Sequence, residues 1–183
     1  VEADRPFQPW VFRSVLDLQP RMLTLALDEK MWAAYHADNG ALYKVWKGNV
    51  ELTGAVYDTY HGPQPVSLGD AYLVNENKNP WEVTMDGKTE MPKALYKGHR
   101  KTKGQVEILY DLVLGNNKII SVAERPEYIE SESGQPGFER IFTFSNLPAG
   151  AKVSMSTNAS SVVSKGKIET DGNLNFTKEA SRK

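Results

Sequence analysis

The stretch that decides the fold class is "QVEILYDLVLGNNKIISVAER", residues 105–125. In its first half every second residue from Val106 to Leu114 is apolar, and a period of two is typical of a β-strand with one buried face. The Gly-Asn-Asn triplet at 115–117 favours a turn, and apolar residues resume over 118–125. This segment therefore predicts a hairpin of two antiparallel strands.

Similar runs recur along the chain at spacings near 8–12 residues, separated by Gly, Pro, Asn and Asp, whereas helical periodicity is nearly absent. Residues 31–37 and 41–47 flank an Asp-Asn-Gly turn and predict a second hairpin. Further strands are predicted over residues 10–16, 21–27, 80–85, 138–144, 152–157, 161–164, 167–170 and 174–177. The pattern predicts an all-β fold, an antiparallel β-sandwich of about a dozen short strands, jelly-roll or supersandwich-like.

The length of 183 residues suits one domain with a core of its own. We interpret residues 1–183 as a single β-sandwich domain excised from a longer chain. From about residue 165 to 183 the chain is polar, which predicts an edge hairpin or the start of a linker. The Gly- and Pro-bearing segment 129–137 predicts an exposed loop.

Composition excludes several kinds of chemistry. The net charge of −1 carries no electrostatic footprint for nucleic acid, and no apolar run is long enough for a membrane span. Because cysteine is absent, thiolate zinc sites, cysteine nucleophiles and covalent c-type haem cannot occur. The three histidines are widely spaced, so no metal and no cofactor is expected in this chain. Absence of cysteine fits a periplasmic or secreted bacterial protein.

Aromatic residues gather around "VYDTYHGPQPVSLGDAY", residues 56–72, which we interpret as a proline-stiffened loop between two strands. Aromatic faces beside fixed polar groups are what a sugar-binding site needs. Because Lys44 shares one strand face with Trp46 and is hard to bury, Trp46 is expected on a wet face. The predicted ligand-binding residues are Trp46, Tyr57, Asp58, Tyr60, His61 and Gln64.

Alternatives remain open at this point. The same aromatics could pack in the core, with function on an outer face. A sugar-active enzyme could use Asp58 or Asp70 with His61 as acid and base, or Asp58 with Asp70 as a pair of carboxylates. Glu124 and Glu139 could form another carboxylate pair, although each precedes an arginine and is better interpreted as part of a cross-strand ion pair. Without a recognisable catalytic motif, the domain on its own is expected not to be an enzyme.

Several short strings carry a resemblance to a known kind of region. They are "FRSVLD" (12–17), "PRM" (20–22), "LYKVWKG" (42–48), "HGPQP" (61–65), "YKGHR" (96–100) and "ERP" (124–126). They resemble a β-sandwich region of large secreted bacterial multidomain proteins that also carry c-type cytochrome and sugar-dehydrogenase-like modules. The resemblance implies an extracytoplasmic accessory domain that binds carbohydrate or docks a neighbouring domain. It transfers no catalytic residue.

Overall fold

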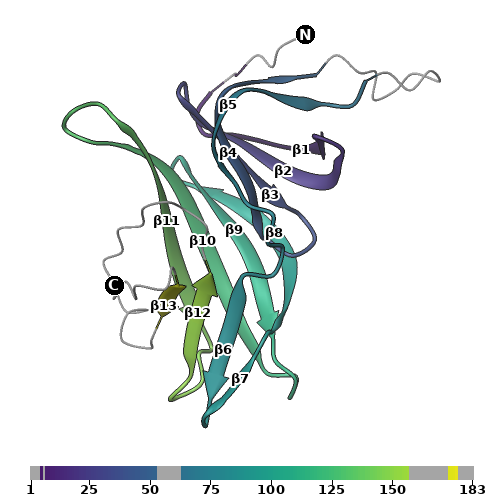
Figure 1. Cartoon of the computed structure of the whole chain (residues 1–183), viewed down its shortest axis with the longest axis vertical. Coiled ribbons are helices and arrows are strands. Elements are labelled where there is room, and N and C mark those ends of the chain that lie inside the picture. The colour runs from purple at the N-terminus through teal and green to yellow at the C-terminus, as the bar shows by residue number, and fades with distance from the viewer. Residues whose placement is uncertain (1–4, 6, 53–62, 157–172, 177–183) are drawn as a thin grey trace.

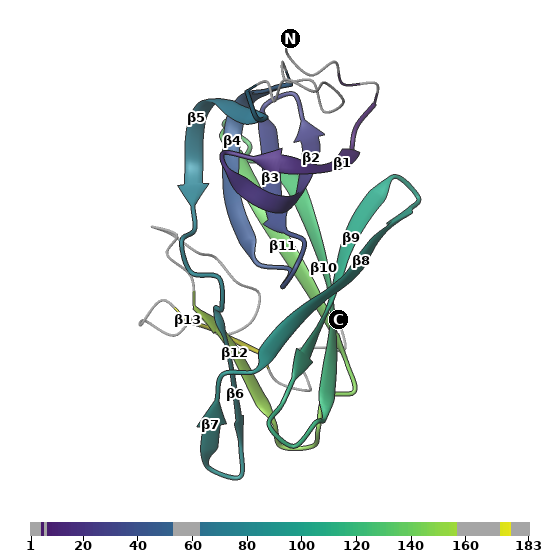
Figure 2. The same cartoon turned by 90° about the vertical axis from the view of Figure 1, so that its right-hand side faces the viewer.

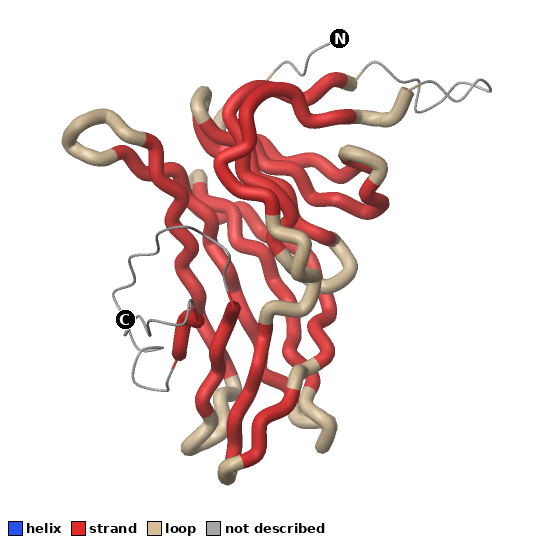
Figure 3. The backbone as a smooth tube through the Cα atoms, viewed as in Figure 1, coloured by secondary structure: helices blue, strands red, loops and turns tan. Residues whose placement is uncertain are grey.

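The computed structural model describes residues 5, 7–52, 63–156 and 173–176. Within these residues the chain forms strands joined by turns and loops, with no helix (Figure 3). The strands make three antiparallel sheets, which confirms the predicted all-β antiparallel sandwich-like fold. None of the described segments is a helix long and apolar enough to cross a membrane.

The three sheets differ in strand order. The first sheet has the order β1 (Trp10–Leu16), β2 (Gln19–Asp28), β3 (Met31–His36), β4 (Leu42–Glu51) and β5 (Val66–Val74). The second sheet has the order β11 (Pro136–Ser145), β10 (Ile119–Glu130), β9 (Gln105–Val113) and β8 (Lys93–Thr102). The third sheet has the order β13 (Asn173–Phe176), β12 (Lys152–Ser156), β6 (Trp81–Met85) and β7 (Lys88–Glu90).

The hairpin predicted over residues 105–125 is β9 and β10, and its alternation has the expected meaning. Val106, Ile108, Tyr110 and Leu112 are buried on one face of β9, and Val122 lies opposite Tyr110 on β10. This inner face packs against the other two sheets in one shared core, to which β2, β3, β6 and β12 also contribute. Figures 1 and 2 show the long second sheet running beside the first sheet at one end and the third sheet at the other.

The structure also corrects the predicted elements. Residues 66–74 belong to strand β5 rather than to a loop, and β7 and β8 were not expected. The predicted exposed loop 129–137 is shorter than expected: residues 131–135 form an exposed turn, whereas β10 and β11 pair as far as Glu130 with Pro136. The predicted strands 161–164 and 167–170 lie outside the described residues, and β13 corresponds to the predicted strand 174–177.

The middle of the first sheet, at β3 and the central part of β2, is buried on both faces. Its second face holds a separate core in which Trp32 and Trp46 stack with ring centroids 6.0 Å apart. The β4–β5 hairpin bends over this core where Gly48 pairs with Gly69, and both glycines have positive φ angles of 142° and 107°. A Cβ atom on Gly48 would lie 1.9 Å from the carbonyl oxygen of Leu68, so only glycine allows this approach. Figure 1 shows β4 and β5 turning together at one end of the molecule.

Candidate functional site

The sugar-binding residues predicted from the sequence do not come together in the described structure. Tyr57, Asp58, Tyr60 and His61 lie outside the described residues, so their prediction stays untested. Gln64 is exposed, next to the buried Pro65 that precedes β5. The aromatic segment 56–72 therefore carries no argument for a site.

The expectation that Trp46 lies on a wet face is wrong. Lys44 and Trp46 do share one face of β4, but that face is covered by the bent β4–β5 hairpin, and Trp46 is 0% exposed. Its indole nitrogen donates a hydrogen bond to the Asn49 carbonyl at 3.0 Å, as a buried tryptophan requires. Lys44 tolerates the position because its ammonium lies 3.6 Å from the Asp17 carboxylate and donates to the Ser67 hydroxyl at 2.7 Å.

The carboxylate pairs predicted for acid–base work are not formed by the described residues. Glu124 on β10 lies opposite Phe142 on β11, whereas Glu139 on β11 lies opposite Glu127 on β10. Positions 124 and 127 are an odd number of residues apart along β10. Glu124 and Glu139 thus project from opposite faces of the second sheet. Asp70 is exposed and lies opposite Lys47, and its suggested partner Asp58 is outside the described residues.

Glu124 instead forms the centre of a buried polar network. The predicted cross-strand ion pair exists as Glu124 with Arg140, but it is buried rather than exposed: Glu124 has no accessible surface. Arg140 donates to both carboxylate oxygens, through Nε at 2.9 Å and Nη2 at 3.0 Å. Tyr110 donates to Oε1 at 2.8 Å, and Tyr35 from β3 donates to Oε2. The network therefore ties the first sheet to the second.

This network is saturated. Each carboxylate oxygen of Glu124 accepts one tyrosine hydroxyl and one guanidinium N–H. Burial raises the pKa of Tyr35 and of Tyr110 well above their usual value, and the Glu124 charge raises both further. Burial opposes the charge of Arg140, but the attraction of Glu124 outweighs it and raises the pKa of the guanidinium. A fully bonded, solvent-excluded carboxylate binds no ligand, so we assign this network to the architecture.

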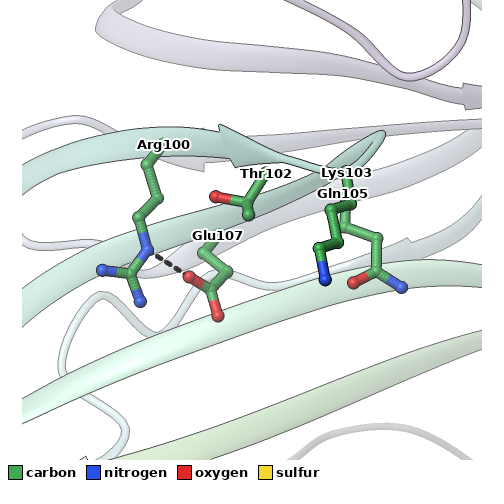
Figure 4. A pocket seen from close by; sticks show the side chains of 5 residues that line it. All are labelled: Arg100, Thr102, Lys103, Gln105 and Glu107. Atoms are coloured by element: carbon green, nitrogen blue, oxygen red, sulfur yellow. Dashed lines mark hydrogen bonds and ion pairs between the residues drawn. The ribbon is translucent and has the colours of Figure 1, made fainter.

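The outer face of the second sheet carries a different kind of polar cluster. A hollow of about 420 Å³ is lined by Arg100, Thr102, Lys103, Gln105 and Glu107 at the tip of the β8–β9 hairpin (Figure 4). We call these five residues the hairpin site. Register explains why they gather: Arg100 pairs with Glu107 and Thr102 with Gln105, so all four share one face, and Lys103 lies in the connecting turn.

The hairpin site is held in place by its own bonds and by those of β10. Arg100 donates its Nε hydrogen to the Glu107 carboxylate. The amide of Gln105 donates to Glu127 at 3.0 Å and accepts from Arg125 at 3.1 Å. These bonds fix the floor of the hollow, because they involve three adjacent strands of one sheet.

Several groups of the hairpin site are uncommitted among the described residues. Lys103 forms no ion pair with any of them, and the Thr102 hydroxyl has no hydrogen bond to them. The bond between Arg100 and Glu107 uses only Nε and Oε2. The two terminal nitrogens of Arg100 and the other carboxylate oxygen of Glu107 therefore have no hydrogen bond to a described residue. The site thus offers several donors and one charged acceptor to a polar ligand.

This arrangement can bind a polar ligand, and its single carboxylate is held by a guanidinium. The described residues contain no group of three or more His, Cys, Asp or Glu that could hold a metal ion. Sequence reasoning missed the site because β8, with its run of polar residues, was not predicted as a strand; the alternation of Arg100, Thr102, Gln105 and Glu107 around Lys103-Gly104 was the available signal.

Comparisons of the chain with models of protein families, with curated proteins and with solved structures found no match.

Proposed function

We propose that the chain is an extracytoplasmic accessory domain, periplasmic or secreted, that binds carbohydrate within a larger bacterial protein containing c-type cytochrome and polysaccharide-processing modules. The observation that supports this most is the hairpin site. Its volume lies in the range of about 300–1,000 Å³ common for small-molecule sites. Its charged, amide and hydroxyl side chains supply the fixed donors and acceptors that sugar hydroxyls require.

The proposal is tested by titrating the ¹⁵N-labelled protein with a panel of neutral and acidic oligosaccharides and following amide shifts. We expect saturable shifts centred on residues 100–107. Glu107→Gln should weaken binding because it removes the charged acceptor, whereas Glu132→Gln, on an exposed turn between β10 and β11, should leave it unchanged. Tryptophan emission is a poor readout, since Trp46 is buried. No saturable binding to any glycan would refute the proposal.

A second candidate function is docking of a neighbouring domain, and a specific observation favours it. Strand β5 is an edge of the first sheet, and its large side chains Val66, Tyr72 and Val74 are 36%, 44% and 43% exposed. Edge strands are commonly protected by lysine, as β8 is by Lys93 and Lys97, but β5 contains none. Slowed hydrogen exchange of β5 amides on addition of the adjacent domain would support docking, and unchanged exchange would count against it.

The alternative of a sugar-active enzyme with an Asp–His pair stays a prediction. Asp58 and His61 lie outside the described part of the chain, and Asp70, the other candidate carboxylate, is exposed opposite Lys47. Turnover of a saccharide by the unmodified protein that is lost in Asp58→Asn would support it.

A further inference from the structure

We infer that the ligand of the hairpin site is an acidic saccharide, one that carries a carboxylate on a sugar ring such as a uronate unit. This inference rests on the proposed function, because it names the ligand class of the same site. It is carried by the charge balance of the hollow, by the groups left uncommitted in it and by the position of Lys103.

The hollow carries a net positive charge that its own residues do not neutralise. Arg100 and Lys103 each contribute +1 and Glu107 contributes −1, so the formal sum is +1. Two other cations on this outer face are matched by acids: Lys97 lies 3.9 Å from Asp111. Arg125 likewise lies 3.0 Å from Glu127. A ligand with one negative charge would therefore complete the pattern, and a neutral sugar would leave the charge of Lys103 unmatched.

The uncommitted groups also fit such a ligand in kind. The Lys103 ammonium and the two terminal nitrogens of Arg100 are charged donors, which form their strongest hydrogen bonds with a carboxylate. The free oxygen of Glu107 can accept from a sugar hydroxyl, and the Thr102 hydroxyl can donate or accept. A uronate ring presents one carboxylate and several hydroxyls at once. A bare anion would use the cations alone and would be repelled by Glu107.

Protection of the sheet edge is the competing explanation for lysines in this region. It accounts for Lys93, Lys97 and Lys101, which lie along edge strand β8. The ammonium of Lys101 is also engaged elsewhere, since it donates to the Pro9 carbonyl at 3.0 Å. Lys103 is different: it lies in the turn beyond the strand, with a positive φ of 50°, and lines the hollow. Edge protection gives no reason for a cation there.

The experiment compares two ligands and two variants. Trigalacturonate and the neutral trisaccharide cellotriose are titrated by calorimetry and by amide shifts at low and at physiological salt. The inference expects trigalacturonate to bind more tightly, and more weakly as salt is added, because its carboxylates pair with exposed cations. Lys103→Asn should weaken trigalacturonate binding about tenfold, since one charged hydrogen bond is lost. Asparagine tolerates the positive φ of this turn.

The matched control is Lys88→Asn, the same substitution on exposed strand β7, which lies at the far end of the molecule from the β8–β9 tip (Figure 2). It should leave both affinities unchanged. Equal affinity for the two trisaccharides, or trigalacturonate binding that Lys103→Asn does not weaken, would overturn the inference while leaving the proposed function intact. Equally tight binding of polyglutamate would also overturn it, since the site would then recognise charge alone. Absence of binding to any saccharide would remove both proposals.

Discussion

The buried network around Glu124 allows a stability prediction whose magnitude follows from the structure. Glu124→Gln keeps the shape of the side chain and removes its charge. One oxygen can still accept from its tyrosine and from Arg140. The amide NH₂ that replaces the other oxygen faces a tyrosine hydroxyl, which can rotate and accept, and an Arg140 N–H, which cannot. The variant therefore leaves a guanidinium charge without its counter-charge and one N–H without an acceptor.

Breaking one side of a buried ion pair typically costs about 3–5 kcal/mol. The side chain of Arg140 is 18% exposed and so keeps part of its hydration, which places the expected loss near the lower end, about 3 kcal/mol. That is a large share of the roughly 5–15 kcal/mol available to a domain. Urea unfolding followed by circular dichroism, with linear extrapolation to water, measures the loss.

The matched control is Glu107→Gln, which makes the same change in an ion pair on the outer face of the same sheet. The side chain of Arg100 is 57% exposed, and pairs of this kind contribute about 0–1 kcal/mol. We therefore expect Glu124→Gln to cost several times more than Glu107→Gln. If the two variants have the same free energy of unfolding within about 0.5 kcal/mol, the buried network does not stabilise the fold more than an exposed ion pair does.

Three further predictions concern pH and backbone geometry. Burial in the folded state raises the pKa of Tyr35 and Tyr110, so through these groups the free energy of unfolding should be independent of pH below about pH 10 and should fall at higher pH. Tyr110→Phe should reduce that slope by about 1.4 kcal/mol per pH unit, measured by urea unfolding. Burial, and secondarily a nearby lysine, lower the pKa of His36, so stability should fall as pH drops below about 6.5, and a pH-independent urea midpoint between 5 and 7.5 would contradict this. Gly48→Ala should destabilise more than Gly98→Ala, because both have positive φ but only the former places a Cβ against backbone; equal melting temperatures would refute the steric argument.

Most of the strand pattern could be predicted because burial on one face leaves a period of two in the sequence. The strands β9 and β10 illustrate this, with a buried residue at every second position. Strand β8 could not be found in this way, since as a sheet edge it places Lys93, Lys97 and Arg100 in solvent and needs few apolar residues. Strand β5 is also an edge, and its Gly69 and Asp70 are residues that usually indicate a turn.

It is harder to predict whether a strand face is buried or exposed than to predict which residues share that face. The alternation of side chains along a strand correctly placed Lys44 and Trp46 on the same face of β4. The inference that this face is exposed to solvent because it carries a lysine was wrong. The reason lies far away in sequence: Asp17 from the β1–β2 turn and Ser67 from β5 supply partners for the ammonium. A local pattern contains neither the bend at Gly48 nor those partners, so it cannot distinguish an outer face from a second core.

Depth also explains how one sheet uses Arg–Glu pairs for two purposes. Glu124–Arg140 points inward and Arg100–Glu107 outward, although both are cross-strand pairs of the second sheet. Two unit charges 4 Å apart attract by about 1 kcal/mol in water and about 4 kcal/mol at an effective dielectric constant of 20. The inner pair is consequently expensive to separate, and with Tyr35 it fixes how two sheets pack. The outer pair can exchange a water or a partner at little cost, which is the property that a ligand-binding surface needs.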